Sequence, residues 1–184
     1  MSLRIVVGPM FAGKTSEIQS VVRRYGCLNK NVLVLTADID NRYQSSVSAV
    51  VNHDRSSIPA HAVAVHDLLK VITWPEFVEA TAVVVDEAQF FAGCLIPFVR
   101  TAVDTYGKHV VVVGLDSDAE QRPFGDVLAL AAHADSIEKK TALCRRCGDG
   151  TPAIFTKALG PRDEVVAVGG ADMYEPVCRR HFST

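Results

Sequence analysis

The feature that most constrains the fold is the run Gly8-Pro-Met-Phe-Ala-Gly-Lys-Thr15, which matches G-x-x-x-x-G-K-[ST] at every fixed position. It follows an apolar segment, residues 3–7, and precedes apolar residues at helical spacing between Ile18 and Tyr25. A strand, a glycine turn and a helix in this order are the context that supports a phosphate-binding loop. We therefore predict that residues 8–15 bind ATP, and a chance glycine-rich turn is the weaker interpretation.

Each part of this loop has an expected role. Glycines at positions 8 and 13 let backbone N–H groups turn inward towards an anion, and the following helix adds the positive end of its dipole. Lys14 is expected to reach the β- and γ-phosphates, and the Thr15 hydroxyl to ligate Mg²⁺. The predicted ATP-binding residues are Gly8, Pro9, Met10, Phe11, Ala12, Gly13, Lys14 and Thr15.

A second motif places two acids after an apolar run. Residues 82–85 predict a buried strand, and Asp86 and Glu87 follow at its carboxyl end. An acid in this place beside a phosphate loop usually holds Mg²⁺, so Asp86 is predicted to do so with Thr15. The neighbouring Glu87 points elsewhere and is a candidate general base for an incoming hydroxyl. The alternative role for Glu87 is to polarise a water molecule, as the second acid of such strands often does in ATPases.

The acids begin Asp86-Glu-Ala-Gln89, which also spells a helicase-like box. Such motors need two ATPase lobes and a basic track for a nucleic-acid strand. The 184 residues allow one medium domain and a small appendage, which is one ATPase lobe. The net charge of −2 and the pI near 6.3 give no indication of binding to nucleic acid or to an anionic membrane. We therefore infer that the match to a helicase motif does not indicate a helicase.

The remaining pattern predicts an α/β fold. The first helix is expected to end near Gly26, and a strand buried on both faces covers residues 32–35. Residues 38–62 are polar, with one short strand at 47–51. Further along we expect a short helix at 68–72 capped by His66-Asp67, a helix at 95–106, a strand at 110–113, and a helix at 127–134 capped by Asp126. The expected architecture for residues 1–142 is a P-loop (RecA-like) parallel sheet flanked by helices.

The tail, residues 143–184, carries Cys144-x-x-Cys147 and Cys178-x-x-His181. Four such ligands in two pairs suit a structural, tetrahedral Zn²⁺. The 30 residues between the pairs, 148–177, exceed the ~15–20 of short zinc patterns, so we expect a hairpin or loop there, with strand-like pieces at 153–156 and 165–168. Redox-active or unrelated cysteines are the alternative. Four neighbouring arginines (Arg145, Arg146, Arg179 and Arg180) would offset thiolate charge and are a weak case for nucleic-acid contact.

The cysteine content also bears on location. Five cysteines, an odd number, fit a secreted disulfide framework poorly and favour a reducing compartment, so the cytoplasm is expected. Cys27 and Cys94 have no partner pattern and are expected to be buried. The sequence shows neither a signal peptide nor an apolar run near the ~18 residues of a membrane span.

Several other residues have open interpretations. Arg42 and Arg55 are candidates for phosphate or acceptor contacts, with solvated loop charges equally favoured, and His53 is more typical of an ordinary loop histidine. Phe90, Phe91 and Phe124 are candidates for an aromatic pocket, of which at least one is expected to be core.

Taken together, these motifs closely resemble the cytosolic, zinc-containing (type II) thymidine kinases, in family order and over nearly the whole chain. The matching pieces are Gly8 to Thr15, Asp40-Asn-Arg42-Tyr43, His53-Asp-Arg55, Asp86-Glu-Ala-Gln-Phe-Phe91, Gly114-Leu-Asp116, Arg122-Pro-Phe-Gly125, Cys144-x-x-Cys147, Thr156-Lys157, and Gly169-Gly-Ala-Asp-Met-Tyr174 through Cys178-Arg-Arg-His181.

The resemblance implies transfer of the γ-phosphoryl group of ATP to the 5′-hydroxyl of thymidine, with deoxyuridine-like analogues as further candidates. It implies Glu87 as general base, Arg42 near the reacting phosphates, and a lasso loop, 165–174, that closes over the nucleoside. The implied substrate contacts are Met10, Gln89, Phe90, Leu115, Phe124, Thr156, Val165, Val166, Ala167, Val168, Gly169 and Tyr174. It further implies a homotetramer and feedback inhibition by thymidine triphosphate.

One departure is Ala119, which falls where relatives often place an aromatic residue near the substrate. Three classes of function stay open from sequence. They are a nucleoside kinase, a P-loop ATPase acting on nucleic acid, and a zinc-stabilised nucleotide-binding regulator without chemistry.

Overall fold

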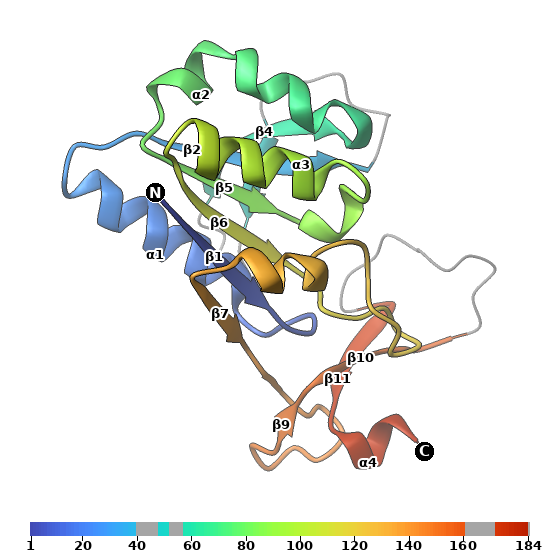
Figure 1. Ribbon diagram of the computed structural model, residues 1–184. Helices are drawn as coiled ribbons and strands as arrows, with labels where there is room; N and C mark the ends of the chain where they lie inside the picture. The colour runs from blue at the N-terminus through green and yellow to red at the C-terminus, as the bar shows by residue number, and fades with distance from the viewer. Residues whose placement is uncertain (40–47, 52–56, 161–171, 184) are drawn as a thin grey trace.

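A seven-stranded sheet forms the centre of the protein in the computed structural model, which describes residues 1–39, 48–51, 57–160 and 172–183. The strand order is β3-β4-β2-β5-β6-β1-β7 (Figure 1). Six strands are parallel, and β3 runs antiparallel to β4 at one edge. Their bounds are β1 (Ser2–Val7), β2 (Val32–Asp38), β3 (Ser48–Val51), β4 (Ser57–Ala64), β5 (Ala82–Asp86), β6 (His109–Gly114) and β7 (Ser136–Lys139). The predicted parallel α/β sheet is confirmed.

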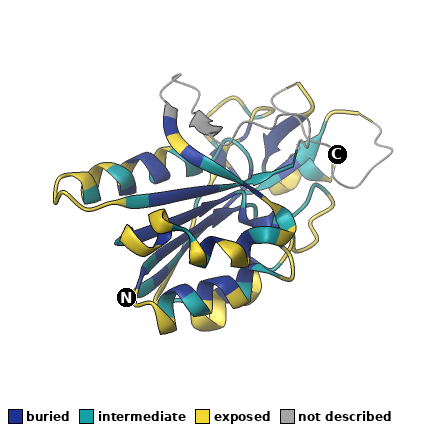
Figure 2. Cartoon of the chain, turned by 90° about the horizontal axis from the view of Figure 1, so that it is seen from above, coloured by how far each residue is buried: buried dark blue, intermediate teal, exposed yellow. Residues whose placement is uncertain are grey.

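The central strands are buried on both faces because successive side chains pack into two different cores. On β5, Val83 and Val85 belong to one apolar cluster and Val84 to the other. Helix α1 (Lys14–Gly26) closes the second cluster through Ile18 and Val21. In Figure 2 the buried strands lie between helices whose outer faces are exposed.

The first cluster is covered by short helical segments on the other face of the sheet. They are η1 (Val65–Thr73), α2 (Pro75–Glu79), α3 (Leu95–Arg100) with its continuation η3 (Thr101–Thr105), and η4 (Leu128–His133). Phe77 of α2 and Phe98 of α3 meet there with ring centroids 6.1 Å apart. The helix predicted at 95–106 is confirmed in extent, but its last turn is a π-helix, and η1 and η4 are 3₁₀-helices.

Three details differ from the sequence expectations. Strand β4 begins within the stretch expected to hold one short strand only and extends past it to Ala64. Neither predicted cap forms. Asp67 pairs with Lys70 (2.8 Å), and Asp126 instead accepts a hydrogen bond from the backbone N–H of Gly93 (2.5 Å).

The C-terminal part consists of two small hairpins and a helical turn. Strand β8 (Ala142–Leu143) pairs with β9 (Pro152–Ala153), β10 (Phe155–Ala158) pairs with β11 (Tyr174–Val177), and α4 (Arg179–Phe182) follows. The piece predicted at 153–156 falls on β9 and β10, and the one at 165–168 lies outside the described residues. Among the helices that the structure describes, none is both long and apolar enough to cross a bilayer.

Candidate active site and metal centre

The phosphate loop and the two acids lie at the same edge of the sheet. Strands β5, β6 and β1 are neighbours in that order and run parallel, so their carboxyl ends meet at one edge. Strand β1 leads into residues 8–13, β5 ends at Asp86, and β6 is followed by Leu115 and Asp116. The fold thus gathers segments that are about 100 residues apart in sequence at one ligand-binding edge.

The phosphate loop is folded tightly enough that its lysine contacts the loop itself. Lys14 Nζ donates to the carbonyl oxygens of Gly8 (3.1 Å) and Pro9 (2.7 Å). Burial lowers the pKa of Lys14, while the carboxylates of Asp86, Glu87 and Asp116 act in the opposite direction. The ammonium group therefore lies within electrostatic reach of the acids that follow β5 and β6.

The C-terminal hairpins cover the outer side of this loop. The backbone N–H of Met10 donates to Thr156 Oγ1 (3.0 Å). Phe11 and Ala12 pack against an apolar cluster formed by Ala142, Cys144, Ala153 and Val177. The loop is also close to the chain that leaves β7, because a Cβ at Gly8 would lie 2.4 Å from the carbonyl oxygen of Lys140. The C-terminal hairpins therefore contact the phosphate loop through one hydrogen bond and an apolar cluster.

The acids at the end of β5 differ in environment. Asp86 is 8% exposed, and its Oδ1 accepts the backbone N–H of Glu87 (2.9 Å). Burial, and then the adjacent Glu87 charge, raise the pKa of Asp86 above its ordinary value. Two neighbouring carboxylates, one of them buried, are stabilised by a cation, and carboxylate and hydroxyl oxygens are ligands that Mg²⁺ accepts. Asp86 therefore offers a buried carboxylate, of a kind that Mg²⁺ accepts, at the edge that carries the phosphate loop.

Glu87 has an unusual backbone. Its φ of 49° and ψ of 39° place it in the left-handed region, which non-glycine residues seldom adopt. Such strain persists only where surrounding contacts over-determine it, and it is concentrated at functional sites. The half-buried Glu87 side chain accepts a hydrogen bond at Oε2 from Gln89 Nε2 (2.5 Å).

Three of the other predicted substrate residues, Phe90, Leu115 and Phe124, come from the segments that follow β5 and β6. The rings of Phe90 and Phe124 meet edge-to-face with centroids 5.4 Å apart, whereas Phe91 is fully buried, as expected for at least one of the three aromatics. Leu115 is half-buried, and Tyr174 begins β11 with 7% of its surface exposed. The predicted Arg42 and Val165 to Gly169 lie outside the described residues, as do Asp40, Tyr43, His53 and Arg55.

Asp116 is a buried acid to which the sequence analysis gave no role. It is 6% exposed; Oδ2 lies 2.6 Å from Lys139 Nζ, and Oδ1 has no hydrogen-bond partner among the described residues. The signal available in sequence was the same as for Asp86, an acid directly after an apolar strand. Its place after β6, between β5 and β1, puts a third carboxylate at this edge.

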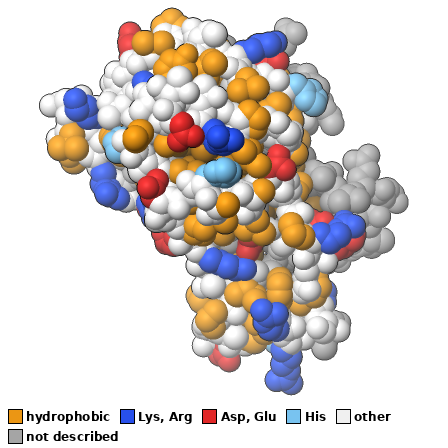
Figure 3. Space-filling model, in the orientation of Figure 1, with side chains coloured by type: hydrophobic (Ala, Val, Ile, Leu, Met, Phe, Trp, Pro, Cys, Tyr) orange, Lys and Arg blue, Asp and Glu red, His pale blue; other side chains and the backbone are white. Residues whose placement is uncertain are grey.

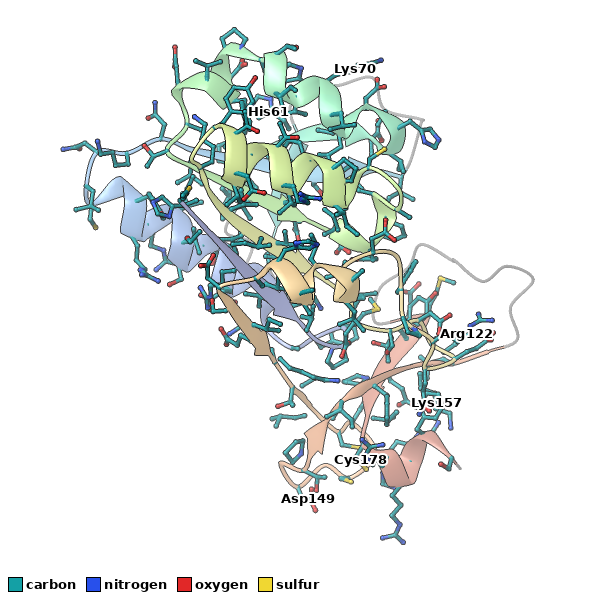
Figure 4. The ribbon with its side chains drawn as sticks, in the orientation of Figure 1. His61, Lys70, Arg122, Asp149, Lys157 and Cys178 are labelled. Carbon is teal, nitrogen blue, oxygen red and sulfur yellow. The ribbon has the colours of Figure 1, made fainter. Side chains whose placement is uncertain are left out.

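A cluster of Cys144, Cys147, Cys178 and His181 lies beneath the hairpins, and Figure 4 labels Cys178 within it. The four ligand atoms all lie within 4.8 Å of one another. His181 Nδ1 is 3.4 Å from the Cys147 sulfur and 3.6 Å from that of Cys178, and these two sulfurs are 3.8 Å apart. A tetrahedral ion with Zn–S bonds of ~2.3 Å sets its sulfur ligands about 3.8 Å apart. The residues therefore fit a zinc ion.

The two remaining cysteines differ from expectation. Cys27 is exposed, directly after α1, so the prediction that it is buried is wrong. Cys94 is half-buried and packs at the edge of the first core cluster. The physical reason for Cys27 is its position in the turn between α1 and β2, away from either core.

We expect Gly125→Ala to destabilise the protein by about 2–5 kcal/mol, combining left-handed strain with overpacking. Gly125 has φ +59°, and an added Cβ would lie 2.2 Å from the backbone oxygen of Gln89. The matched control is Gly107→Ala. Its φ is +66°, and no atom lies within 4 Å of the added Cβ, so backbone strain alone should lower its stability, by about 1–2 kcal/mol. Urea unfolding measures both; equal losses would show that the close approach to Gln89 is unimportant.

The fold and this edge define a P-loop protein of the α/β class, with an attached cysteine–histidine cluster that could hold zinc. The sequence model of the family "Thymidine kinase" matches residues 1–182. The chain belongs to the thymidine kinase family.

Three relatives illustrate the similarity. The "Thymidine kinase" of Oryza sativa subsp. japonica is 39% identical over 182 residues, which is 98% of this chain and 65% of that protein. The "Thymidine kinase, cytosolic" of Homo sapiens is 36% identical over 178 residues, 96% of this chain and 71% of that protein. The "Thymidine kinase" of Monkeypox virus is 33% identical over 181 residues, 98% of this chain and 96% of that protein.

Proposed function

We propose that this protein is an ATP-dependent thymidine kinase, a phosphotransferase acting on an alcohol group in nucleotide salvage. It transfers the γ-phosphoryl group of ATP to the 5′-hydroxyl of thymidine, giving dTMP and ADP. The observation that carries the proposal, beside family membership, is the placement of Glu87 next to buried Asp86 at the strand edge that also holds the Lys14 loop.

The residues of this edge divide the work of phosphoryl transfer. The Lys14 ammonium and backbone N–H groups of the loop hold the phosphates of ATP. Pro9 and Met10 are not among them, because Pro9 has no N–H and the N–H of Met10 donates to Thr156. Glu87 takes the proton of the 5′-hydroxyl as it attacks. Asp86 and the Thr15 hydroxyl would hold magnesium, which would neutralise charge on the phosphates.

The thymine base is proposed to lie among Met10, Phe90, Leu115, Phe124 and Thr156. This proposal is supported by the contact between the Phe90 and Phe124 rings and by the hydrogen bond from Met10 to Thr156. Tyr174 and residues 165–169 are proposed to close over the nucleoside, with Gln89 at the floor of the site and Arg42 near the phosphates.

The C-terminal unit is proposed to be a separate zinc-binding domain, residues 143–184, beside the nucleotide-binding domain, residues 1–142. The sheet ends with β7, and the two hairpins form their own small apolar cluster. Zinc bound to Cys144, Cys147, Cys178 and His181 would supply structural cross-linking of the hairpins.

Three further properties are proposed from family membership. They are a cytoplasmic location, a homotetrameric assembly and feedback inhibition by thymidine triphosphate. The word "cytosolic" in the names of the human and hamster relatives supports the first. Light scattering of the purified protein, and turnover measured with increasing thymidine triphosphate, test the other two.

The function is tested by incubating the protein with ATP, Mg²⁺ and a panel of deoxynucleosides. We expect ADP release that depends on thymidine. ADP release stimulated only by single-stranded DNA would instead indicate a nucleic-acid-dependent ATPase, and ATP binding without turnover would indicate a regulator. On the face shown in Figure 3, basic and acidic side chains of the described residues are interspersed rather than gathered in a basic stripe, which favours the kinase.

A further inference from the structure

We infer that Gln89 is a positioning residue, which fixes the orientation of the Glu87 carboxylate and ties it to the backbone at Leu115. The inference rests on the proposed function, because it assumes that Glu87 is the base. It assigns Gln89 a role that differs from direct contact with the substrate.

Both polar ends of the Gln89 amide are used inside the protein. Oε1 accepts the backbone N–H of Leu115 (3.0 Å), and Nε2 donates to Glu87 Oε2 (2.5 Å). The Leu115 N–H is a donor and can bond only to the amide oxygen of Gln89. The amide nitrogen is therefore the end that faces Glu87. The donor end is therefore directed at the carboxylate by a backbone group of a neighbouring segment.

Gln89 is buried where two glycines approach it closely. Its side chain is fully enclosed, with the residue 1% exposed. A Cβ at Gly114 would lie 2.7 Å from Gln89 Oε1, and one at Gly125 would lie 2.2 Å from the Gln89 carbonyl oxygen. The end of β6 and the loop that ends at Gly125 thus approach the glutamine at two points. At Gly125 the left-handed backbone and the close carbonyl both require glycine, and at Gly114 a larger residue would displace the Gln89 side chain.

Glu87 needs such a support. Its left-handed backbone projects the side chain from a sharp turn at the end of β5. Among the described residues, Gln89 is the partner that the structure gives to its carboxylate. A neutral amide holds Oε2 without adding a positive charge, and it leaves Oε1 to accept the proton of a substrate hydroxyl. Small misplacements of a reacting group carry large rate costs, so this support acts on the chemical step.

The test is a double-mutant cycle with Gln89→Met, which keeps length and volume and removes both hydrogen bonds. We expect kcat for thymidine phosphorylation to fall about 10–100-fold, with KM for thymidine and for ATP within about threefold of the parent values. In a Glu87→Gln background the same substitution should change kcat less than threefold, because the group that it positions is already gone.

A structural role would give a different result. Gln19→Met is the matched control, since Gln19 is also a buried glutamine (7% exposed) but lies on α1; it should keep kcat whatever it costs in stability. Gln89→Glu, with the same shape and no amide donor, serves if Gln89→Met does not fold, and is expected to lose kcat to a similar extent.

Each outcome bears on one claim. A kcat within twofold of the parent in a folded Gln89 variant, or equal losses in both backgrounds, would overturn the positioning role while leaving the kinase proposal intact. Absence of thymidine phosphorylation by the parent protein would overturn the proposed function itself.

Discussion

Replacing Glu87 with glutamine is expected to lower kcat for thymidine phosphorylation by about 10²–10⁴-fold, the usual cost of losing a general base. The amide keeps the size of the side chain but does not take up the hydroxyl proton. Its oxygen can still accept the hydrogen bond that Gln89 Nε2 donates to Glu87 in the parent, so the turn after β5 should be preserved. The affinities for ATP and thymidine, measured by calorimetry, should change little.

A matched control separates this effect from loss of charge. Glu79→Gln makes the same change at an exposed position of α2, remote from the phosphate loop. It should leave kcat unchanged. If Glu87→Gln also retained kcat within a few-fold, with ATP and thymidine at saturation, Glu87 would not be the base.

The second large effect is expected from Cys178→Ala. A structural zinc site contributes on the order of 10 kcal/mol of apparent binding free energy, comparable to the ~5–15 kcal/mol stability of a whole domain. Losing one ligand should therefore release the metal and unfold the hairpins. Because Thr156 holds the Met10 N–H and the hairpin core packs on Phe11, the phosphate loop should lose support as well.

The measurements are metal content by mass spectrometry, thymidine phosphorylation, and hydrogen exchange of the loop amides at positions 8 and 10–13. The variant should lose bound zinc, activity and protection of the loop. Cys27→Ala is the matched control, since Cys27 is an exposed cysteine after α1, and it should retain all three. A Cys178→Ala protein with full activity and a protected loop would show that the metal cluster does not support the loop.

The sequence predicted the parts of the fold that rest on strong local patterns. Strands β1, β2, β5 and β6 are apolar runs buried on both faces, and α1 follows the phosphate motif directly. The cysteine and histidine spacing predicted a cluster that the structure brings together. In each case the signal lies within a few consecutive residues.

The missed elements are those that depend on partners. Strand β4 contains Pro59 and His61, which weaken any strand pattern, and it forms because β2 pairs with it. Strand β7 is short and mostly exposed, and pairs with β1 at the edge of the sheet. Helix α2 begins at Pro75 and was not predicted; it has five residues only, too few for a helical pattern in the sequence, and proline suits the first turn of a helix.

In the site, too, features with a local sequence pattern were predicted and features that depend on distant partners were not. The acids at the end of β5 were predicted from their place after an apolar strand. The link between Gln89 and Leu115 was not, because it depends on β6 lying beside β5 and on two glycines that admit the glutamine. Asp116 also follows an apolar strand in the sequence, but its burial and its place between β5 and β1 depend on the strand order and were not predicted.

The most direct test of the account is a crystal structure with thymidine and a non-hydrolysable ATP analogue bound together. We expect a Glu87 carboxylate oxygen within about 2.6–3.2 Å of the thymidine 5′-oxygen, with that oxygen in line with the terminal phosphate held by the loop at residues 8–15. A carboxylate turned away from the 5′-oxygen, or a nucleoside bound remote from the phosphate loop, would contradict the assignment.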